Sequence, residues 1–473
     1  MSEHSDFFAE EAEPQELSMP PSIFRAYDIR GVADSELTAD IVELIAKAIA
    51  SEAQDIGIES LLIGFDARLS SPVLSKALIK GVLETGCNVI SLGLIPTPML
   101  YFAAHTCQTT SGVMLTASHN PANYNGLKIV FNKTCLADNQ IQQIRSRIKA
   151  GSLRRGSGKY SEVDISESYL DAICSRIKLS KPLKLVIDCG NAVPGVIAPA
   201  LFERLGCEVI PLFCELDGSF PNHHPDPTDS KNMIQLADEV VRQKADLGIA
   251  FDGDGDRLGL VTDKGETVST DKLLMLLVKA IAPHYPGRPI IFDVKSSAAL
   301  AQLIAQLGAV PMMHRSGHSF MKQKMLETNA PLGGEYAAHV FIKDRWFGFD
   351  DGLYAAARVI ESISQQSHSS SAEFESYKTP ISTDEIAVAV SDEHKFELID
   401  HIQRSADFPG CQIISLDGLR VEFEFGWGLV RASNTSPALL LRFEANTDEE
   451  IELIKAQFKD LLHSADKNLQ LNF

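Results

Sequence analysis

Three aspartates at alternate positions, Asp252, Asp254 and Asp256, follow directly after the short apolar run Leu247–Phe251. The apolar run predicts a buried strand, and the glycines between the aspartates allow a tight loop in which the carboxylates converge on one point. Converging carboxylates repel one another unless a cation binds between them, and Mg²⁺ prefers such oxygen ligands. We therefore predict a Mg²⁺ site in this loop, with the guanidinium of Arg257 beside it to bind a phosphate oxygen.

Two other interpretations of the aspartate loop are a calcium-binding EF-hand loop and a solvated acidic turn. An EF-hand loop begins with the same alternation but requires glycine at its sixth position, glutamate at its twelfth and a preceding helix. Here Arg257 and Asp263 occupy those two positions, and a predicted strand precedes the loop. A strand that leads into Asp-Gly-Asp-Gly-Asp-Arg favours a catalytic divalent site.

The elements that must position this loop belong to a pattern that occurs three times. An apolar strand ends in aspartate, a helix-like stretch then ends at glycine, and a second strand follows. The aspartates are Asp66, Asp188 and Asp293, and the glycines are Gly86, Gly206 and Gly308. The aspartates lie 122 and 105 residues apart and the glycines 120 and 102, so the two sets of spacings agree. We infer three diverged copies of one α/β domain.

Each copy also carries a distinctive loop near its third strand. The loops are Gly112-Val-Met-Leu-Thr-Ala-Ser-His-Asn-Pro121, the aspartate loop, and Gly333-Gly-Glu-Tyr-Ala-Ala-His339. Ligands bind at the carboxyl ends of the strands in open α/β sheets, so we expect these loops to face a common cleft. The segment Asn222-His-His-Pro-Asp226 has no evident role; its adjacent histidines are typical of a proline-bounded surface loop more than of a metal site.

Beyond a serine-rich stretch over 364–371, which predicts a linker, the pattern of the chain changes. Strands are predicted around 386–390, 419–424 and 438–443, followed by a helix over 448–462. The loop Arg431-Ala-Ser-Asn-Thr-Ser-Pro437 combines an arginine with small hydroxyl donors. These features predict a fourth, α+β domain.

Composition limits the partners of the protein. A chain of 473 residues that is 45% apolar can form several globular domains. A formal charge of −20, with no block dense in lysine and arginine, argues against nucleic acid or an anionic membrane as a partner. No apolar run approaches the length that spans a bilayer. The eight cysteines include no Cys-x-x-Cys, which favours reduced thiols in the cytoplasm. Residues 1–20 are acidic and predict a disordered tail.

Five segments now support a resemblance. They are Phe24-Arg-Ala-Tyr-Asp-Ile-Arg-Gly31, Thr116-Ala-Ser-His-Asn-Pro121, Asp252-Gly-Asp-Gly-Asp-Arg257, Gly334-Glu-Tyr-Ala-Ala-His339 and Arg431-Ala-Ser-Asn-Thr-Ser-Pro437. In type and order they resemble the α-D-phosphohexomutase family, specifically its bacterial phosphomannomutase/phosphoglucomutase branch, from about Pro21 to the C-terminus. The resemblance implies three similar α/β/α domains and a smaller α+β C-terminal domain around a central cleft, which agrees with the repeat. We expect the domains at 21–163, 164–266, 267–378 and 379–473.

The resemblance also implies the chemistry. The family interconverts hexose 1-phosphates and 6-phosphates, here of mannose and/or glucose, through an active-site phosphoserine and a hexose 1,6-bisphosphate. Ser118 is implied to carry the phosphate and to bind Mg²⁺ together with Asp252, Asp254 and Asp256. A phosphoserine adds nearly two negative charges to three carboxylates, so the assembly requires the metal. Phosphoryl transfer then depends on positioning and charge stabilisation.

Further residues receive roles from the same resemblance. Lys128, ranked first, and His119 are the candidates for the general acid/base, although a solvated lysine and a turn histidine are the ordinary fates of these residues. Arg30 and Arg257 complete the catalytic set. The residues implied to bind substrate are Tyr27, Lys295, His318, Glu335, His339, Arg431, Ser433, Asn434 and Thr435.

Three alternatives stay open from the sequence. Phosphoglucosamine mutases usually carry Gly-Thr-Glu-Pro where this chain has Asn434-Thr-Ser-Pro437, which favours the mannose/glucose branch. A Mg²⁺-dependent sugar phosphatase would pass the phosphate to water, and a sugar-phosphate-binding protein would not need Ser118. Many family members have serine where Ala337 stands, so the preference between mannose and glucose is not decided. The oligomeric state is not decided either.

Overall fold

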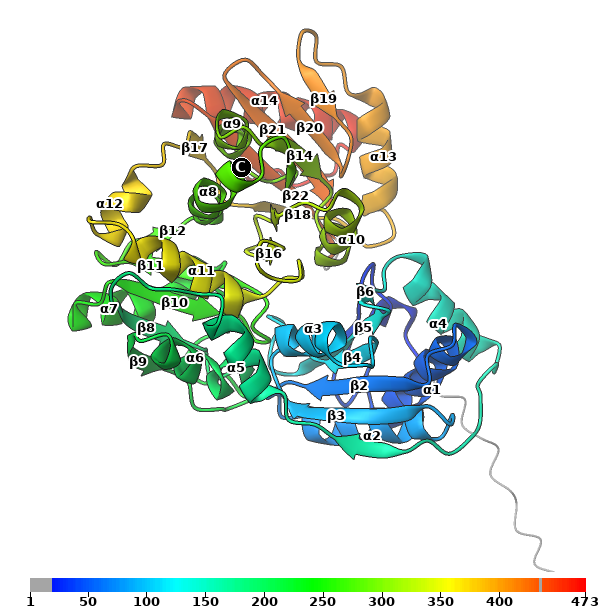
Figure 1. The fold of residues 1–473 in the computed structure, drawn as a ribbon. Coiled ribbons are helices and arrows are strands. Elements are labelled where there is room, and N and C mark those ends of the chain that lie inside the picture. Colours follow the sequence, from blue (N-terminus) through cyan, green and yellow to red (C-terminus); the bar gives the residue numbers. More distant parts are fainter. Residues whose placement is uncertain (1–18, 434–435) are drawn as a thin grey trace, which may run out of the picture.

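The computed structural model describes residues 19–433 and 436–473. Nearly all of the predicted acidic tail, and the candidate ligands Asn434 and Thr435, therefore lie outside the described residues. Three α/β/α domains and a smaller α+β domain surround a central region (Figure 1). The fold class predicted from the sequence is confirmed.

The first domain contains a mixed sheet with strand order β1-β5-β4-β2-β3-β7, in which β6 pairs with β5. Its described elements are η1 (Pro21–Ile23), β1 (Ile29–Val32), α1 (Ala39–Asp55), β2 (Ser60–Phe65), α2 (Ser71–Leu83), β3 (Asn88–Leu94), α3 (Thr97–Thr106), β4 (Gly112–Leu115), β5 (Tyr124–Phe131), β6 (Thr134–Cys135), α4 (Asn139–Lys149) and β7 (Tyr160–Glu162). The side chain of Thr38 accepts a hydrogen bond from Ile41 N and caps α1, which fixes where this helix begins.

The second domain has the strand order β12-β11-β10-β8-β9. Its described elements are α5 (Ser166–Cys174), β8 (Lys184–Asp188), η2 (Val193–Val196), α6 (Ala198–Arg204), β9 (Glu208–Leu212), η3 (Ser230–Met233), α7 (Ile234–Gln243), β10 (Leu247–Phe251), β11 (Leu258–Thr262) and β12 (Thr267–Val268). Strand β10 is buried along its whole length, as its unbroken apolar run predicts.

The third domain has the strand order β14-β13-β15-β16. Its described elements are α8 (Thr270–Ile281), η4 (Ala282–His284), β13 (Pro289–Asp293), α9 (Ala298–Gln306), β14 (Val310–His314), α10 (His318–Thr328), β15 (Leu332–Gly334), β16 (Val340–Ile342), α11 (Gly352–Ser364) and α12 (Ser370–Glu375). Because α11 ends at Ser364 and α12 begins at Ser370, the stretch over 364–371 is not the free linker that its composition predicts. Ser370 and Ser371 are buried and bind Asp263, and Ser369 caps α12.

The three sheets share one topology, which explains the repeat in the sequence. The second strand of each copy is parallel to the first on one side and the third is parallel to it on the other, and a fourth strand pairs antiparallel to the third. The loop between the third and fourth strands is the one that carries Ser118, the three aspartates or Glu335. Equivalent loops therefore meet at one place.

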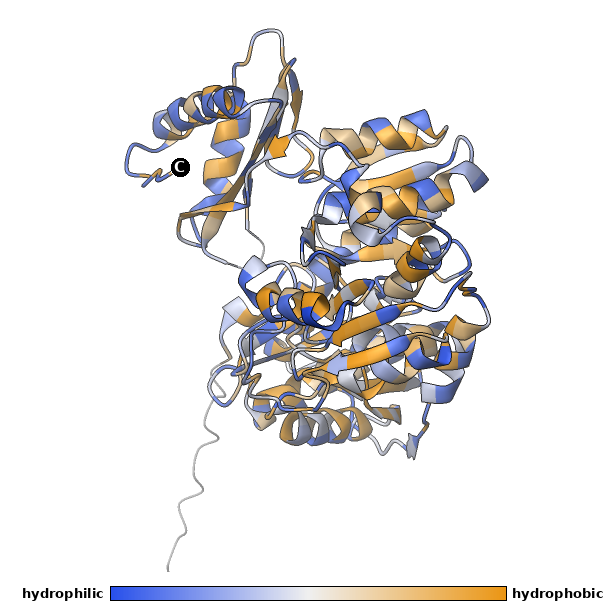
Figure 2. Cartoon of the chain, turned by 90° about the vertical axis from the view of Figure 1, so that its left-hand side faces the viewer, coloured by the Kyte–Doolittle hydropathy of each residue, from blue (hydrophilic) through white to orange (hydrophobic). Residues whose placement is uncertain are grey.

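The fourth domain stands beside the other three (Figure 2). Its described elements are β17 (Ile381–Ser382), β18 (Ile386–Ala389), α13 (Lys395–Ser405), β19 (Gln412–Ile414), β20 (Leu419–Glu422), β21 (Gly426–Ala432), β22 (Ala438–Ala445) and α14 (Asp448–Ala465). One hydrophobic cluster runs through domains 1, 2 and 3, with α3 among its buried members, whereas the C-terminal domain packs its sheet and helices into a cluster of its own. Domains 1 to 3 therefore share a core.

Candidate active site

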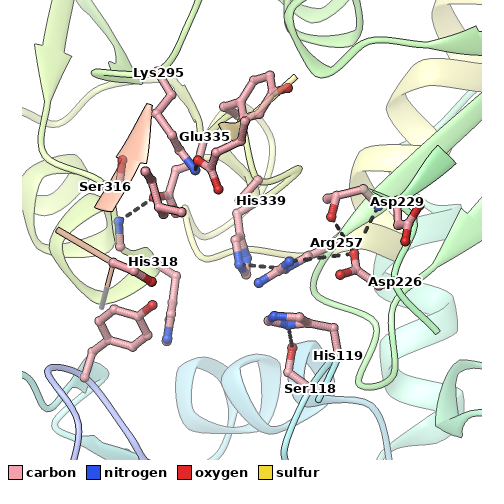
Figure 3. Close-up of a pocket in the computed structure, with 18 of the residues that line it drawn as sticks. Ser118, His119, Asp226, Asp229, Arg257, Lys295, Ser316, His318, Glu335 and His339 are labelled. Atoms are coloured by element: carbon pink, nitrogen blue, oxygen red, sulfur yellow. Dashed lines mark hydrogen bonds and ion pairs between the residues drawn. The ribbon is translucent and has the colours of Figure 1, made fainter. Parts of the chain in front are cut away.

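A cleft of about 500 Å³ lies where the four domains meet (Figure 3). All four domains contribute to its lining. The predicted site residues that line it are Tyr27, Arg30, Ser118, His119, Lys128, Arg257, Lys295, His318, Glu335, His339, Arg431 and Ser433. The three aspartates of the second domain are fully buried next to it. The fold thus brings together residues from nearly the whole length of the chain.

Ser118 lies at the turn between β4 and β5 in a left-handed backbone conformation, with φ of 51°. Such a conformation is unfavourable for a residue with a Cβ atom, so surrounding contacts must hold it. Thr116 Oγ1 accepts a hydrogen bond from Ser118 N at 2.9 Å, and Arg68 Nη2 donates to Ser118 O at 2.7 Å. Arg68 also donates to the carbonyl oxygens of Asn120, Pro121 and Tyr124, so this buried guanidinium fixes the whole loop.

The hydroxyl of Ser118 faces the aspartate loop of the second domain. Its Oγ donates to Asp252 Oδ2 at 2.8 Å and lies 3.1 Å from His119 Nδ1. The two loops touch so closely that a Cβ atom at Gly253 would lie 2.2 Å from Ser118 O. Glycine at position 253 is therefore required for the serine and the carboxylates to meet.

The aspartate loop fits a divalent cation. One oxygen of each of Asp252, Asp254 and Asp256 lies within 4.8 Å of the others, and Asp254 Oδ1 has no hydrogen-bond partner among the described residues. Burial, together with repulsion from Asp254 and Asp256, raises the pKa of Asp252 well above its ordinary value. A hard cation stabilises carboxylates that are buried and repel one another, and their oxygen atoms are the ligands that Mg²⁺ prefers.

Lys128, on β5, contacts two of these carboxylates. Its Nζ lies 2.6 Å from Asp254 Oδ2 and 2.5 Å from Asp256 Oδ2. Burial alone would lower the pKa of this ammonium group, but the two carboxylates outweigh burial and raise it. The opposite holds for His119, because burial and the nearby charges of Arg257 and Arg30 lower the pKa of its imidazole. One candidate acid/base is thus held charged and the other neutral.

Arg257 connects the loops of the second and third domains. Its backbone N donates to Asp252 Oδ1 at 3.1 Å, and its Nε donates to His339 Nε2 at 3.1 Å. On the other side, Nη1 lies 4.0 Å from Asp226 Oδ1. Figure 3 shows Arg257 between His339 and Asp226, on the side that faces Ser118 and His119.

Further cations line the part of the cleft that the third and fourth domains form. Arg431 Nε donates to Asp417 Oδ2 at 3.0 Å, and Lys295 Nζ donates to Glu385 Oε2 at 3.1 Å. Arg30, on β1, pairs with Asp28 and also contacts Asn120 in the Ser118 loop. Positive groups therefore lie both near Ser118 and at the fourth domain, as two separated phosphates would require.

Glu335 comes from the third-domain loop and lies buried in the wall of the cleft. Burial raises its pKa from 4.5 to about 7, and its Oε1 accepts a hydrogen bond from Gly317 N. Ala337, from the same loop, also lines the cleft, as does His318 at the first position of α10. The edge of the Tyr27 ring contacts His318 with centroids 4.8 Å apart.

The aspartates of the repeat anchor loops beside the cleft: Asp66 the loop of Ser118, Asp293 the loop of Glu335, and Asp188 the loop of His223. Asp66 accepts hydrogen bonds from Arg68 and Thr116, Asp188 accepts from Gly190 and lies 2.9 Å from His223 Nε2, and Asp293 accepts from Ser316 and Tyr336. The same position in each copy thus holds a loop of the cleft. The sequence indicates these aspartates only as the ends of strands.

Sequence reasoning missed several other residues of the cleft. Asp226, Thr228, Asp229 and Ser230 line it in the second domain, and Asp384 and Glu385 in the fourth. The segment that contains Asp226 is a loop, as its prolines predict, but it borders the cleft, and its His223 pairs with Asp188. Neither His223 nor His224 belongs to a metal-compatible group among the described residues. The proline-bounded loop was visible in the sequence, but its position beside Arg257 depends on the fold.

Comparisons with known proteins agree with the fold and the cleft. Models of the phosphoglucomutase/phosphomannomutase family match along the chain: α/β/α domain I over residues 21–155, domain II over 167–265, domain III over 269–379 and the C-terminal domain over 385–461. A phosphomannomutase/phosphoglucomutase of Pseudomonas aeruginosa is 50% identical over 456 residues, which cover 96% of this chain and 98% of that protein. A phosphoglucomutase of Neisseria meningitidis serogroup A is 44% identical over 446 residues, covering 93% and 97%.

A solved structure extends the comparison to three dimensions. The crystal structure of a phosphoglucomutase/phosphomannomutase family protein from Burkholderia thailandensis superposes with a TM-score of 0.92 at 41% identity, covering 96% of this chain and 100% of that one. Fold and cleft are thus those of a four-domain enzyme class with three related α/β/α domains. The chain belongs to the phosphoglucomutase/phosphomannomutase family. None of the helices in the described ranges is long and apolar enough to cross a membrane.

Proposed function

We propose that this enzyme interconverts the 1-phosphates and 6-phosphates of mannose and of glucose, through phosphorylated Ser118 and a hexose 1,6-bisphosphate. The observation that carries the proposal is the hydrogen bond from Ser118 Oγ to Asp252 Oδ2 at 2.8 Å, in a cleft whose cations come from all four domains. A serine beside a cluster of carboxylates is a poor base-activated nucleophile, because the nearby negative charges disfavour an alkoxide. The same place suits a serine phosphate ester whose negative charge is stabilised by a metal.

Asp252, Asp254, Asp256 and the phosphate of Ser118 would hold Mg²⁺, which would draw negative charge from the transferring phosphoryl group when bound. Arg257, fixed by His339, is positioned to bind oxygens of the same group. The sugar hydroxyl must also exchange a proton. Lys128 is charged and suits a donor, whereas His119 is neutral and suits an acceptor.

The distant phosphate needs an anchor while the near one reacts. We assign this role to Arg431 and Ser433, which line the fourth-domain part of the cleft together with Lys295. Asn434 and Thr435 stay in this assignment on the sequence resemblance alone. After the first transfer the bisphosphate must turn end for end, so the contacts to its ring must serve two orientations. Tyr27, His318, Glu335 and His339 are the proposed ring contacts.

The proposed domain boundaries at 21–163, 164–266, 267–378 and 379–473 give each domain one loop of this function. Sugar phosphates are the proposed partners, since local cations must offset the formal charge of −20 before an anionic substrate can bind. All eight cysteines are free, which supports a reducing compartment and hence the cytoplasm as the place of action.

The decisive experiment compares mannose, glucose and glucosamine 1-phosphates with Mg²⁺ and trace glucose 1,6-bisphosphate, and follows formation of the 6-phosphates. We expect conversion of the first two and phosphate on the tryptic peptide that contains Ser118. Comparable turnover of glucosamine 1-phosphate would assign the other branch of the family. Stoichiometric release of inorganic phosphate would instead identify a sugar phosphatase, and a Ser118→Ala variant of unchanged activity would exclude the phosphoserine.

A further inference from the structure

A buried charged cluster lies behind His339, and the proposed function does not use it. Asp350, between β16 and α11, is fully buried. Its Oδ1 accepts a hydrogen bond from Lys322 Nζ at 2.7 Å, and its Oδ2 lies 3.2 Å from His339 Nδ1. Lys322 also donates to Tyr101 OH at 3.1 Å and lies over the Tyr101 ring. Removing two charges from water is unfavourable, so a buried pair at this place requires an explanation.

The contacts of His339 fix the position of its ring proton. Arg257 Nε donates to His339 Nε2, and a guanidinium has donors only. Nε2 must therefore offer its lone pair, which leaves Nδ1 as the nitrogen that carries a ring proton. That nitrogen lies 3.2 Å from Asp350 Oδ2 and 3.5 Å from Asp256 Oδ1, near enough for electrostatic attraction, but the geometry forms no hydrogen bond, and none of the three atoms has a hydrogen-bond partner among the described residues. A carboxylate behind an imidazole favours the tautomer that carries its proton on the nitrogen nearer the negative charge.

We infer that Asp350, paired with Lys322, is a positioning residue that keeps His339 in the Nδ1–H tautomer and thereby holds Arg257 in the cleft. The contacts run from Tyr101 in the first domain through the Lys322–Asp350 pair in the third to Arg257 in the second. Asp350 is not among the residues that line the cleft, so it acts through His339, which does line it. Loss of this support would release the guanidinium that is proposed to bind phosphate.

A metal ion is the alternative to a proton between these atoms. Asp256, His339 and Asp350 each offer a ligand atom within 4.8 Å of the others, as a metal ion requires. Lys322 already lies against Asp350, and the guanidinium of Arg257 contacts the ring of His339. A further cation would therefore lie between two positive groups. A proton on Nδ1 turns the positive end of the N–H dipole toward the two carboxylates without adding a charge.

The test reads the tautomer directly. In protein labelled with ¹⁵N-histidine, two-bond ¹H–¹⁵N correlation spectra distinguish Nδ1–H from Nε2–H, and His339→Gln assigns the signal. We expect Nδ1–H in the resting enzyme, a shift toward Nε2–H in Asp350→Asn, and a fall in kcat/KM of about 10- to 100-fold for that variant. Lys322→Met should change both readouts in the same direction, and Lys322→Arg should restore them in large part.

Asp344→Asn is the matched control, because Asp344 is a mostly buried aspartate paired with Arg358 away from the cleft. It should leave the His339 signal and kcat/KM unchanged. An Nε2–H signal in the wild type, or an unchanged signal in Asp350→Asn, would overturn the inference. A bound metal ion that is lost in the Asp350→Asn variant but retained in the Asp254→Asn variant would also overturn the inference. The kinetic consequence rests on the proposed mutase function, but the tautomer is measured without substrate, so the two can fail separately.

Discussion

Arg68 donates a hydrogen bond to the carbonyl oxygen of Ser118 at 2.7 Å although 50 residues separate the two in the chain. The same guanidinium binds three further carbonyl oxygens of the loop and the carboxylate of Asp66. The proposed phosphate acceptor is therefore held by an arginine that does not line the cleft. Its contribution can be measured apart from substrate binding.

Replacing Arg68 by methionine should leave the Ser118 loop without its support and the buried Asp66 carboxylate without its positively charged partner. Breaking a buried pair in this way costs about 3–5 kcal/mol. We expect a lower urea midpoint and a lower fraction of Ser118 phosphorylated after incubation with glucose 1,6-bisphosphate. Arg204→Met removes a more exposed arginine and is the control. Wild-type phosphorylation in Arg68→Met would show that the loop keeps its shape unaided.

The left-handed conformation of Ser118 predicts a stability difference between two inactive variants. Glycine adopts a positive φ without the steric cost of about 1–2 kcal/mol that a Cβ atom imposes. Ser118→Gly should therefore be more stable than Ser118→Ala by about 1 kcal/mol, and both should lack mutase activity. Urea unfolding of the two proteins gives the comparison. Equal midpoints would mean that the loop relaxes when the hydroxyl is lost.

Removal of one loop carboxylate should weaken the metal site. Because Asp254 Oδ1 is unpartnered within the described part of the chain, Asp254→Asn deletes a charge that is available to a cation. We expect Mg²⁺ affinity, followed by competition with Mn²⁺ in electron paramagnetic resonance, to fall by about tenfold or more, with activity falling in parallel. The exposed aspartate in Asp238→Asn serves as a control. Retained Mn²⁺ binding in Asp254→Asn would remove Asp254 from the ligand set.

Glu335 predicts a pH-dependent stability. Its pKa is raised from 4.5 to about 7 in the folded protein, so the folded state binds its proton more tightly than the unfolded state does. Stability from this group is present below pH 4.5 and is lost as the pH rises through 7. Glu335→Gln cannot ionise and should be more stable than the wild type at about pH 8, by at most about 3 kcal/mol, and nearly equal to it at about pH 4.5.

The same substitution should raise the KM for hexose phosphate, because it replaces a carboxylate acceptor for sugar hydroxyls by a neutral amide. Urea midpoints at the two pH values and initial rates at the higher one give both readouts. A destabilised Glu335→Gln at the higher pH would mean that the native carboxylate is well solvated or paired, contrary to its burial.

The sequence predicts the fold and the centre of the site because both depend on local or periodic signals. The strand, glycine and aspartate order of residues 247–257 specifies its loop within a short segment, and the similar spacing of Asp66, Asp188 and Asp293 reveals the repeat. Arg68, Asp226 and Asp350 have no such signal. Their roles arise from contacts with residues far away in the chain, and each alone is an ordinary charged residue.

For the serine-rich stretch, in contrast, the sequence contains a signal that leads to a wrong prediction. Composition favours a flexible connection over 364–371, but Asp263 accepts hydrogen bonds from Ser370 and Ser371, and a short helix starts there. The acceptor lies more than 100 residues earlier. Local composition therefore could not indicate that the Ser370 hydroxyl and the Ser371 backbone N–H have a partner.

Asp66, Asp188 and Asp293 occupy one position in three copies, and each secures a different loop. The three sheets thus offer one common point of attachment for a loop. Because the aspartates lie at the ends of sheet strands and the site residues lie in the loops, a loop can change its length or its sequence without disturbing the strands. On this common framework one copy carries Ser118, another the three aspartates and the third Glu335.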